Sequence, residues 1–156
     1  MDGVARAAPI LETVVTTTNP DGAVNCAAMG VEWGEQRIVI KPYLGTRTLR
    51  NLRATEVAVV NLTDDILLFS QAALGDPRPP IRAAAGVEGA VLDAACSWRE
   101  VRVEAIEDGE ARARVSTVVV GGGATGRGTA SCRAGGGRHP AGRPAAPLGG
   151  RARGPR

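Results

Sequence analysis

Histidine is nearly absent from this sequence, since the only one, His139, lies in the last 36 residues. The first 120 residues therefore have no imidazole for a Ser/His/Asp triad, a Cys/His pair or an ordinary zinc site. We predict no metal site. Any chemistry in this region must rely on carboxylates or on a cofactor that brings its own reactive atoms, as flavin and nicotinamide enzymes do.

Long apolar runs and a regular cysteine pattern are also missing. No segment approaches the roughly 18 apolar residues of a membrane helix, and MDGVARAAPI at the N-terminus has no continuous apolar stretch. Cys26, Cys96 and Cys132 have no CxxC spacing, so we expect reduced thiols, with Cys26 and Cys96 buried as small apolar side chains. These absences predict a cytoplasmic protein without a membrane partner.

Acidic residues are absent after Glu110, which divides the chain into two parts of different charge. Residues 1–120 hold 12 basic and 16 acidic residues, a net charge of −4, whereas residues 121–156 hold seven basic residues and no acidic one. The pI of about 9.1 therefore reflects the tail alone. We predict no nucleic-acid partner.

The tail, residues 121–156, consists of Gly, Ala, Arg or Pro at 30 of its 36 positions. Such a segment buries too little apolar surface to offset its chain entropy, so we expect it to be disordered. These four residue types have codons whose first two bases are only G and C, which suggests a frameshift in a GC-rich gene. The alternative is a natural Gly/Arg-rich linker or RNA-contacting arm. A conventional amphipathic continuation in another frame of the gene would support the frameshift.

Residues 1–120 are long enough for one domain with a modest core. Two short helices are predicted at 46–54 and 66–74, and residues 76–89 read as a loop. Strand-like segments with turn signals between them are more numerous, at 10–18, 23–33, 37–43, 56–63, 97–108 and 109–120. The pattern predicts a mainly β fold, an antiparallel β-barrel with two short helices.

The start of the first predicted helix is the strongest candidate site. Thr46, Arg47 and Thr48 place two hydroxyls and a cation where unpaired helix N–H groups would favour a phosphate. The alternative is an ordinary helix start, with Thr46 as N-cap and Arg47 solvated.

Two further blocks end predicted strands. Residues 25–30 combine Asn25, Ala27, Ala28, Met29 and Gly30, which would let a flat ring approach the backbone. Alternatively, these small residues form a tight strand crossing and Met29 fills the core.

The other block contains Asn61, Thr63, Asp64 and Asp65. Asn61 could bond either the following loop or a ligand, and capping of the next helix is a better role for this block than metal binding, because neighbouring strand residues face opposite ways.

Together these blocks resemble a family of FMN-binding split-barrel flavoproteins of unknown function, related to pyridoxamine-phosphate-oxidase-like and flavin-reductase-like barrels. The family pattern is E-T-x-x-T-T, N-x-A-P-M-G, P-Y-x-x-T-x-T-x-x-N-L and V-V-N-x-T-D-D. In this chain the four blocks start at Glu12, Asn25, Pro42 and Val59, and the resemblance covers residues 10 to about 115. Ala28 replaces the family's proline, and we expect the family's helical C-terminal region to be missing or out of frame here.

The resemblance implies an antiparallel split β-barrel that binds FMN near the interface of a homodimer. It assigns the phosphate to Thr46, Arg47, Thr48 and Asn51, and the ring to the backbone of residues 25–30. Tyr43 and Asn61 belong to the same motifs. Lys41 or Arg50 would raise the potential of the bound flavin, and NAD(P)H or another electron donor would reduce it.

Two functions fit this sequence. The first is a flavin-dependent oxidoreductase whose substrate the sequence does not specify. The second is a non-catalytic module, either a flavin carrier or sensor or a vestigial barrel that acts through association.

Overall fold

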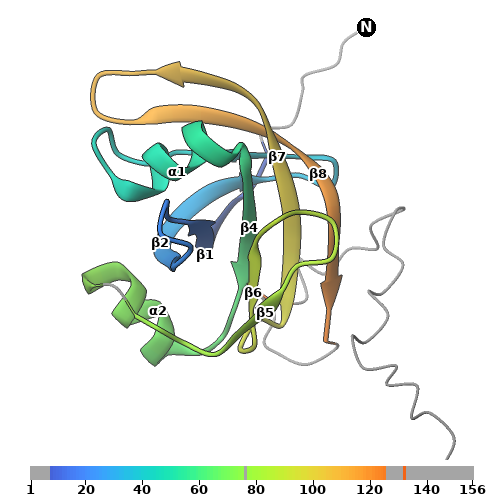
Figure 1. The fold of residues 1–156 in the computed structure, drawn as a ribbon. Coiled ribbons are helices and arrows are strands. Elements are labelled where there is room, and N and C mark those ends of the chain that lie inside the picture. Colours follow the sequence, from blue (N-terminus) through green and yellow to red (C-terminus); the bar gives the residue numbers. More distant parts are fainter. Residues whose placement is uncertain (1–7, 76, 126–131, 133–156) are drawn as a thin grey trace, which may run out of the picture.

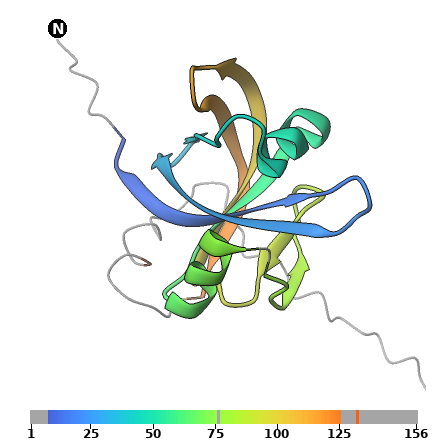
Figure 2. The same cartoon turned by 90° about the vertical axis from the view of Figure 1, so that its left-hand side faces the viewer.

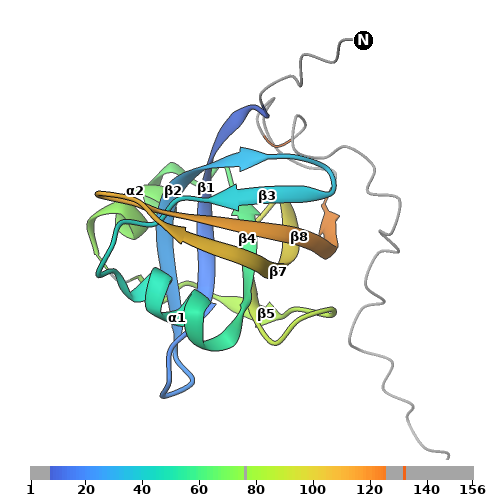
Figure 3. The same ribbon diagram turned by 90° about the horizontal axis from the view of Figure 1, so that it is seen from above.

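The structure, a computed structural model, describes residues 8–75, 77–125 and 132. Six of its strands close into an antiparallel barrel in the order β1-β2-β3-β8-β7-β4 (Figure 1). Seen from above, β2, β3, β8 and β7 lie side by side (Figure 3). The barrel strands are β1 (Ile10–Thr18), β2 (Val24–Trp33), β3 (Arg37–Ile40), β4 (Val57–Leu62), β7 (Ser97–Asp108) and β8 (Ala113–Ala124). The predicted antiparallel barrel is confirmed.

Two short helices lie on one side of the barrel, with α1 (Arg47–Thr55) above α2 (Ile66–Leu74) in the view of Figure 2. Both agree with the sequence prediction to within one residue. Each begins at a side-chain cap, because Thr46 Oγ1 accepts a bond from Leu49 N and Asp65 Oδ1 accepts one from Leu68 N. Capping of α2 by this block is therefore confirmed, with Asp65 as the cap.

The core has two layers because successive strand residues point to opposite faces. Val15 and Val60 belong to the cluster that fills the barrel, whereas Val14 and Val59 belong to a second cluster that also contains Leu68 of α2. All four valines are fully buried. The continuous apolar runs in β1 and β4 are thus explained by burial on both faces of the sheet.

The prediction of a loop at residues 76–89 is wrong in part, because this segment contains one strand of a small hairpin. β5 (Ile81–Ala83) pairs with β6 (Ala90–Leu92) outside the barrel. Bonds to distant segments hold this hairpin in place: Thr16 Oγ1 donates to Ala90 O at 2.6 Å, and Gly86 N donates to the buried Glu100 carboxylate. Neither partner is local, so the turn-rich sequence alone does not reveal the strands.

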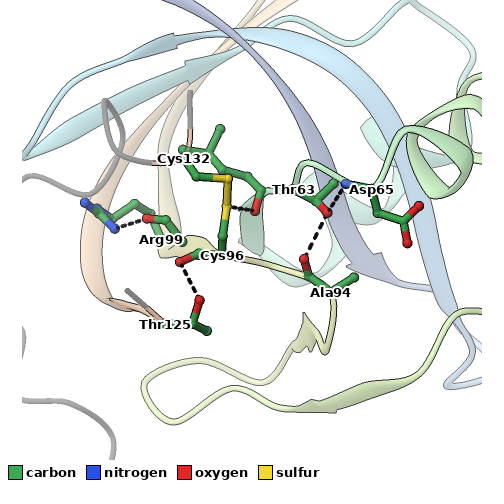
Figure 4. Close-up of a disulfide and its surroundings, with 9 residues drawn as sticks. Thr63, Asp65, Ala94, Cys96, Arg99, Thr125 and Cys132 are labelled. Carbon is green, nitrogen blue, oxygen red and sulfur yellow. Dashed lines mark hydrogen bonds between the residues drawn. A yellow bond between two sulfur atoms is a disulfide. The ribbon is translucent and has the colours of Figure 1, made fainter. Parts of the chain in front are cut away.

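A disulfide joins Cys96 and Cys132, which corrects the prediction of reduced thiols (Figure 4). Cys26 remains a buried thiol, as expected. The pairing depends on the β7–β8 hairpin, whose return brings Thr125 N within 2.8 Å of Cys96 O. Because the two cysteines are 36 residues apart and show no spacing motif, the sequence offered no signal for this bond. Disulfides are rare in the reducing cytosol, so this bond does not support the predicted cytoplasmic location. That location stays a prediction.

β8 continues four residues past the boundary predicted at residue 120. Its glycines are needed there because the backbone and the Trp98 side chain of β7 lie close against them. A Cβ at Gly123 would lie 2.6 Å from the Trp98 ring, and one at Gly122 would lie 2.5 Å from Trp98 O. Residues 121–124 therefore belong to the barrel, while the frameshift stays a prediction.

The prediction of a disordered tail covered residues 121–156 and is wrong for residues 121–124, which belong to β8. Residues 126–131 and 133–156, with His139, lie outside the described residues. Within the described ranges, neither helix has the length and apolar character needed to cross a membrane.

Candidate functional site

A cavity of about 710 Å³ lies where β2 meets the start of α1 and the end of α2. These elements are far apart in sequence but face the same side of the barrel (Figure 2). Nine of the eleven residues predicted for cofactor binding line it. They are Asn25, Ala27, Ala28, Met29, Gly30, Tyr43, Thr46, Arg47 and Thr48.

One end of the cavity is formed by the N-terminus of α1. The hydroxyl of Thr46 has a structural role, because it donates to Tyr43 O at 2.7 Å and accepts from Leu49 N at 3.4 Å. Thr48 is buried, and its Oγ1 accepts a bond from Asn25 Nδ2 at 3.1 Å. Arg47 is exposed. The cavity therefore combines a cation, a helix N-terminus and a fixed hydroxyl, which suits an anionic group.

The long wall of the cavity is the outer edge of β2. Residues 24–30 pair with β1, whereas β3 pairs only with residues 31–33, so this edge has no strand neighbour among the described residues. Backbone N–H and C=O groups of an open edge can bond a ligand. Small residues at positions 27, 28 and 30 keep this wall accessible, and Thr13 Oγ1 fixes Met29 from the β1 side through Met29 O at 2.9 Å. A flat heterocycle fits such a wall.

Two predicted residues do not line this cavity. Asn51 is buried beside the β1–β2 turn, where its Nδ2 donates to Thr17 Oγ1 at 3.0 Å and to Asn19 Oδ1 at 2.8 Å. Asn61 is fully buried between β1 and β6, where its Nδ2 donates to Val14 O and its Oδ1 accepts from Leu92 N. The two roles considered for Asn61 were a bond to the following loop and a bond to a ligand. The structure instead shows bonds to β1 and β6, and the ligand role stays a prediction. The amide of Asn51 holds the turn, and its phosphate role stays a prediction.

Several lining residues were not assigned from sequence. Glu12 stands within a recognised motif, while Ala72 and Ala73 come from α2 and carry no chemical signal. Arg112 also lines the cavity, although it is 69 residues from Tyr43 in the sequence. Its guanidinium lies 4.0 Å from the centre of the Tyr43 ring and donates a hydrogen bond to the Tyr43 hydroxyl. Only the closure of the barrel reveals this pair.

Lys41 lines the cavity and belongs to an ion-pair network, whereas Arg50, the other donor considered for a reduced flavin, does not line it. Lys41 Nζ lies 2.6 Å from Glu32 Oε2, and Arg114 holds the same carboxylate with bonds of 2.8 and 3.2 Å. The hydrogen bonds from Arg114 and then from Lys41 hold the pKa of the Glu32 carboxyl below its ordinary value. Glu32 thus fixes the position of the Lys41 ammonium.

Replacing Glu32 by glutamine should lower stability in a pH-dependent way. Because the folded-state pKa is depressed, the contribution of Glu32 is present above pH 4.5 and is lost as the pH falls through the folded-state pKa. We expect a loss of about 0.5–1 kcal/mol at neutral pH, as for a partly exposed ion pair. Urea unfolding at neutral and strongly acidic pH measures the difference.

Glu104→Gln is the matched control, since its carboxylate lies 3.5 Å from an exposed arginine. It should change stability little at either pH. An effect of Glu32→Gln that is equally large in acid would assign the loss to packing rather than to the charge.

The cavity has the size and chemistry of a nucleotide-cofactor site. Its volume falls within the roughly 300–1,000 Å³ of small-molecule pockets, and it joins a cationic end to an open strand edge. No group of three metal-type side chains occurs among the residues that the structure describes. The arrangement favours a ligand with an anionic end and a flat ring.

Residues 11–125 match the family model described as protein of unknown function (DUF447), N-terminal domain. No curated protein matches the chain. Solved structures share the fold. An FMN-bound DUF447 protein from Methanosarcina mazei is 18% identical with a TM-score of 0.65, and the alignment covers 76% of this chain and 62% of that one.

Two further structures have similar scores. Component B of nitrilotriacetate monooxygenase from Mycobacterium thermoresistibile is 14% identical, with a TM-score of 0.69 and coverage of 78% of this chain and 72% of that one. The styrene monooxygenase flavin reductase from Pseudomonas putida S12 is 15% identical, with a TM-score of 0.63 and coverage of 74% and 81%. The chain spans 62% of the length of the Methanosarcina protein. At these identities the likeness establishes the barrel fold.

Proposed function

Because this chain belongs to the DUF447 family, whose N-terminal domain it contains, we propose that it binds FMN and acts as a flavin-dependent oxidoreductase. One observation carries this proposal: a single cavity joins the N-terminus of α1 to the open edge of β2. These two features match the two ends of FMN, a phosphate and a flat ring. The relative from Methanosarcina mazei was solved with FMN bound.

In this proposal the phosphate contacts Arg47, Thr48 and the first turn of α1, and the ring lies along residues 25–30. The Asn25 bond to Thr48 Oγ1, at 3.1 Å, orients the hydroxyl at the phosphate end. When bound, FMN supplies the redox chemistry by passing electrons through N5. Lys41 on the cavity wall would stabilise negative charge on the reduced ring and so raise the reduction potential.

We propose a homodimer as the active form, reduced by NAD(P)H or another electron donor. The exposed face of α2 supports a second copy, because Ile66, Leu67 and Leu74 are 80%, 68% and 90% exposed. Apolar patches of this kind mark association surfaces. Since Ala72 and Ala73 of the same helix line the cavity, a partner on this face would also limit solvent access to the flavin.

Reconstitution of the full chain tests the flavin proposal. Purified protein incubated with FMN and then desalted should retain the flavin absorption bands and quench flavin fluorescence, because the ring would be held against protein atoms. Bovine serum albumin treated in the same way is the control for nonspecific retention. A colourless product after reconstitution would contradict FMN binding.

Anaerobic reduction separates the oxidoreductase from a flavin carrier. We expect NADH or NADPH to bleach the bands of the bound flavin, and oxygen or an added acceptor to restore them. Chemical reduction by dithionite is the control that the bound flavin can accept electrons. Bleaching by dithionite but by neither nicotinamide would favour the second candidate, a carrier or sensor, or a donor of another class.

A further inference from the structure

A second cavity, of about 480 Å³, lies beside the proposed FMN cavity and shares Arg47 with it. Arginines from two segments line it, namely Arg47 and Arg50 of α1 and Arg78 of the loop after α2. The remaining wall is the turn between β1 and β2, which extends past α1 in Figure 3. We name this cavity the arginine pocket.

The arginines meet there because of helix geometry and a fixed turn. Residues three apart share one side of a helix, so Arg47 and Arg50 face the same way as Ala54, which also lines the pocket. The opposite wall is held in place by Asn51 Nδ2, which bonds Asn19 Oδ1 at 2.8 Å. The pocket is therefore formed without a ligand.

Among the described residues that line the arginine pocket, the acidic one is Asp21. Its carboxylate is engaged by the backbone, since its Oδ1 accepts a bond from Ala23 N at 2.9 Å. Elsewhere Arg37, Arg53, Arg82 and Arg114 each pair with a carboxylate. Arg50 and Arg78 form no ion pair with any residue in the described ranges. Unbalanced cations in a concave site favour an anionic ligand.

We propose that the arginine pocket binds a second phosphate, carried by the adenylate half of a dinucleotide. This inference rests on the proposed function, because the first phosphate is the one assigned to the α1 N-terminus. Arg47 lines both cavities, so its guanidinium can contact two phosphates that follow one another in a chain. The volume of the arginine pocket, about 480 Å³, lies within the range of small-molecule sites.

Two dinucleotides carry this chemistry. A flavin dinucleotide would place its ring in the larger cavity and its adenylate in the arginine pocket. A nicotinamide dinucleotide would instead bring its adenylate phosphate to the pocket while FMN occupies the larger cavity. A recessed site of this size suits one small anion better than a polynucleotide backbone, which needs an extended basic surface.

The test compares the Arg50→Ala/Arg78→Ala double variant with Arg53→Ala, a control on the same helix that does not line the pocket. Titration calorimetry of the full chain measures binding of FMN, FAD, NADPH and ADP. We expect the double variant to lose about 10- to 100-fold in affinity for ADP and for one dinucleotide, with FMN affinity within about twofold. Arg53→Ala should leave all four affinities unchanged.

The pattern of lost affinities among the four ligands identifies the ligand of the pocket. It also separates this proposal from the flavin proposal. Selective loss of FAD indicates the flavin dinucleotide, and selective loss of NADPH indicates the nicotinamide one. If wild type binds ADP but not FMN, the pocket stands and the flavin proposal fails. If FMN binds while ADP, FAD and NADPH are unaffected by the double variant, the arginine pocket proposal is overturned. Equal loss of FMN and FAD would also overturn it.

Discussion

Replacing Arg47 and Thr48 together by alanine is expected to weaken FMN binding by about 100-fold. Each side chain offers a hydrogen bond to a charged phosphate, worth about 1.5–3 kcal/mol, and solvent exposure of Arg47 reduces its share. The helix N–H groups remain, so binding should be weakened rather than abolished. Titration of flavin fluorescence quenching measures the affinity.

Riboflavin provides the control for this prediction because it has the same ring and no phosphate. If the two side chains contact the phosphate, the double variant should bind riboflavin about as well as wild type does. Equal losses for FMN and riboflavin would place the effect on the ring or on the fold. Unchanged FMN affinity would remove the proposed phosphate site.

Thr48 also has a structural role, so conservative substitutions are needed to separate stability from FMN binding. Thr48→Ala removes the acceptor of the Asn25 amide, and an unsatisfied buried donor costs about 1–3 kcal/mol of stability. Thr48→Ser keeps the hydroxyl and should keep FMN affinity. Arg47→Lys retains the charge but loses the planar fork, so an intermediate affinity is expected.

The sequence predicted those parts of the fold that local patterns determine. Both helices follow from caps and periodicity, and the first hairpin follows from the turn at Asn19 to Gly22. Part of the cavity lining was predictable for the same reason. Residues 25–30 and 46–48 are short continuous segments, and their side-chain chemistry suggests ligand binding without knowledge of the fold.

What the sequence did not reveal depends on contacts between distant segments. Arg112 reaches Tyr43 only after the barrel closes, and Arg78 joins Arg50 only when the loop after α2 lies against the β1–β2 turn. The same holds for the β5–β6 hairpin. The glycines after Val120 were misread as tail because composition cannot show that Trp98 crosses them.

Asn61 is the clearest case in which a motif residue has a structural role, and its replacement should give the largest loss of stability. We expect Asn61→Ala to lower the free energy of unfolding by about 3 kcal/mol, since several buried polar groups lose their partner at once. Urea unfolding followed by intrinsic fluorescence measures the change. FMN affinity of the protein that remains folded should stay within about twofold of wild type.

The size of this effect follows from what the amide holds together. Asn61 Nδ2 donates to Val14 O at 2.9 Å, and Asn61 Oδ1 accepts from Leu92 N at 3.0 Å. It thereby ties β1 to β6 through the wall of the barrel. Alanine would leave Leu92 N without its acceptor in a region closed to water, whereas Asn61→Asp keeps that acceptor, loses the donors and should be destabilised as well.

Thr63→Ala serves as the control, because its exposed bond to Ala94 O at 2.9 Å lies in the same segment and should contribute less than about 1 kcal/mol. Hydrogen exchange locates the damage. If Asn61 anchors the hairpin, Asn61→Ala should lose protection first at Leu92 and along β6, while β7 and β8 remain protected. Lost FMN binding in a variant of unchanged stability would instead return Asn61 to the cofactor site, since only a ligand contact gives that combination.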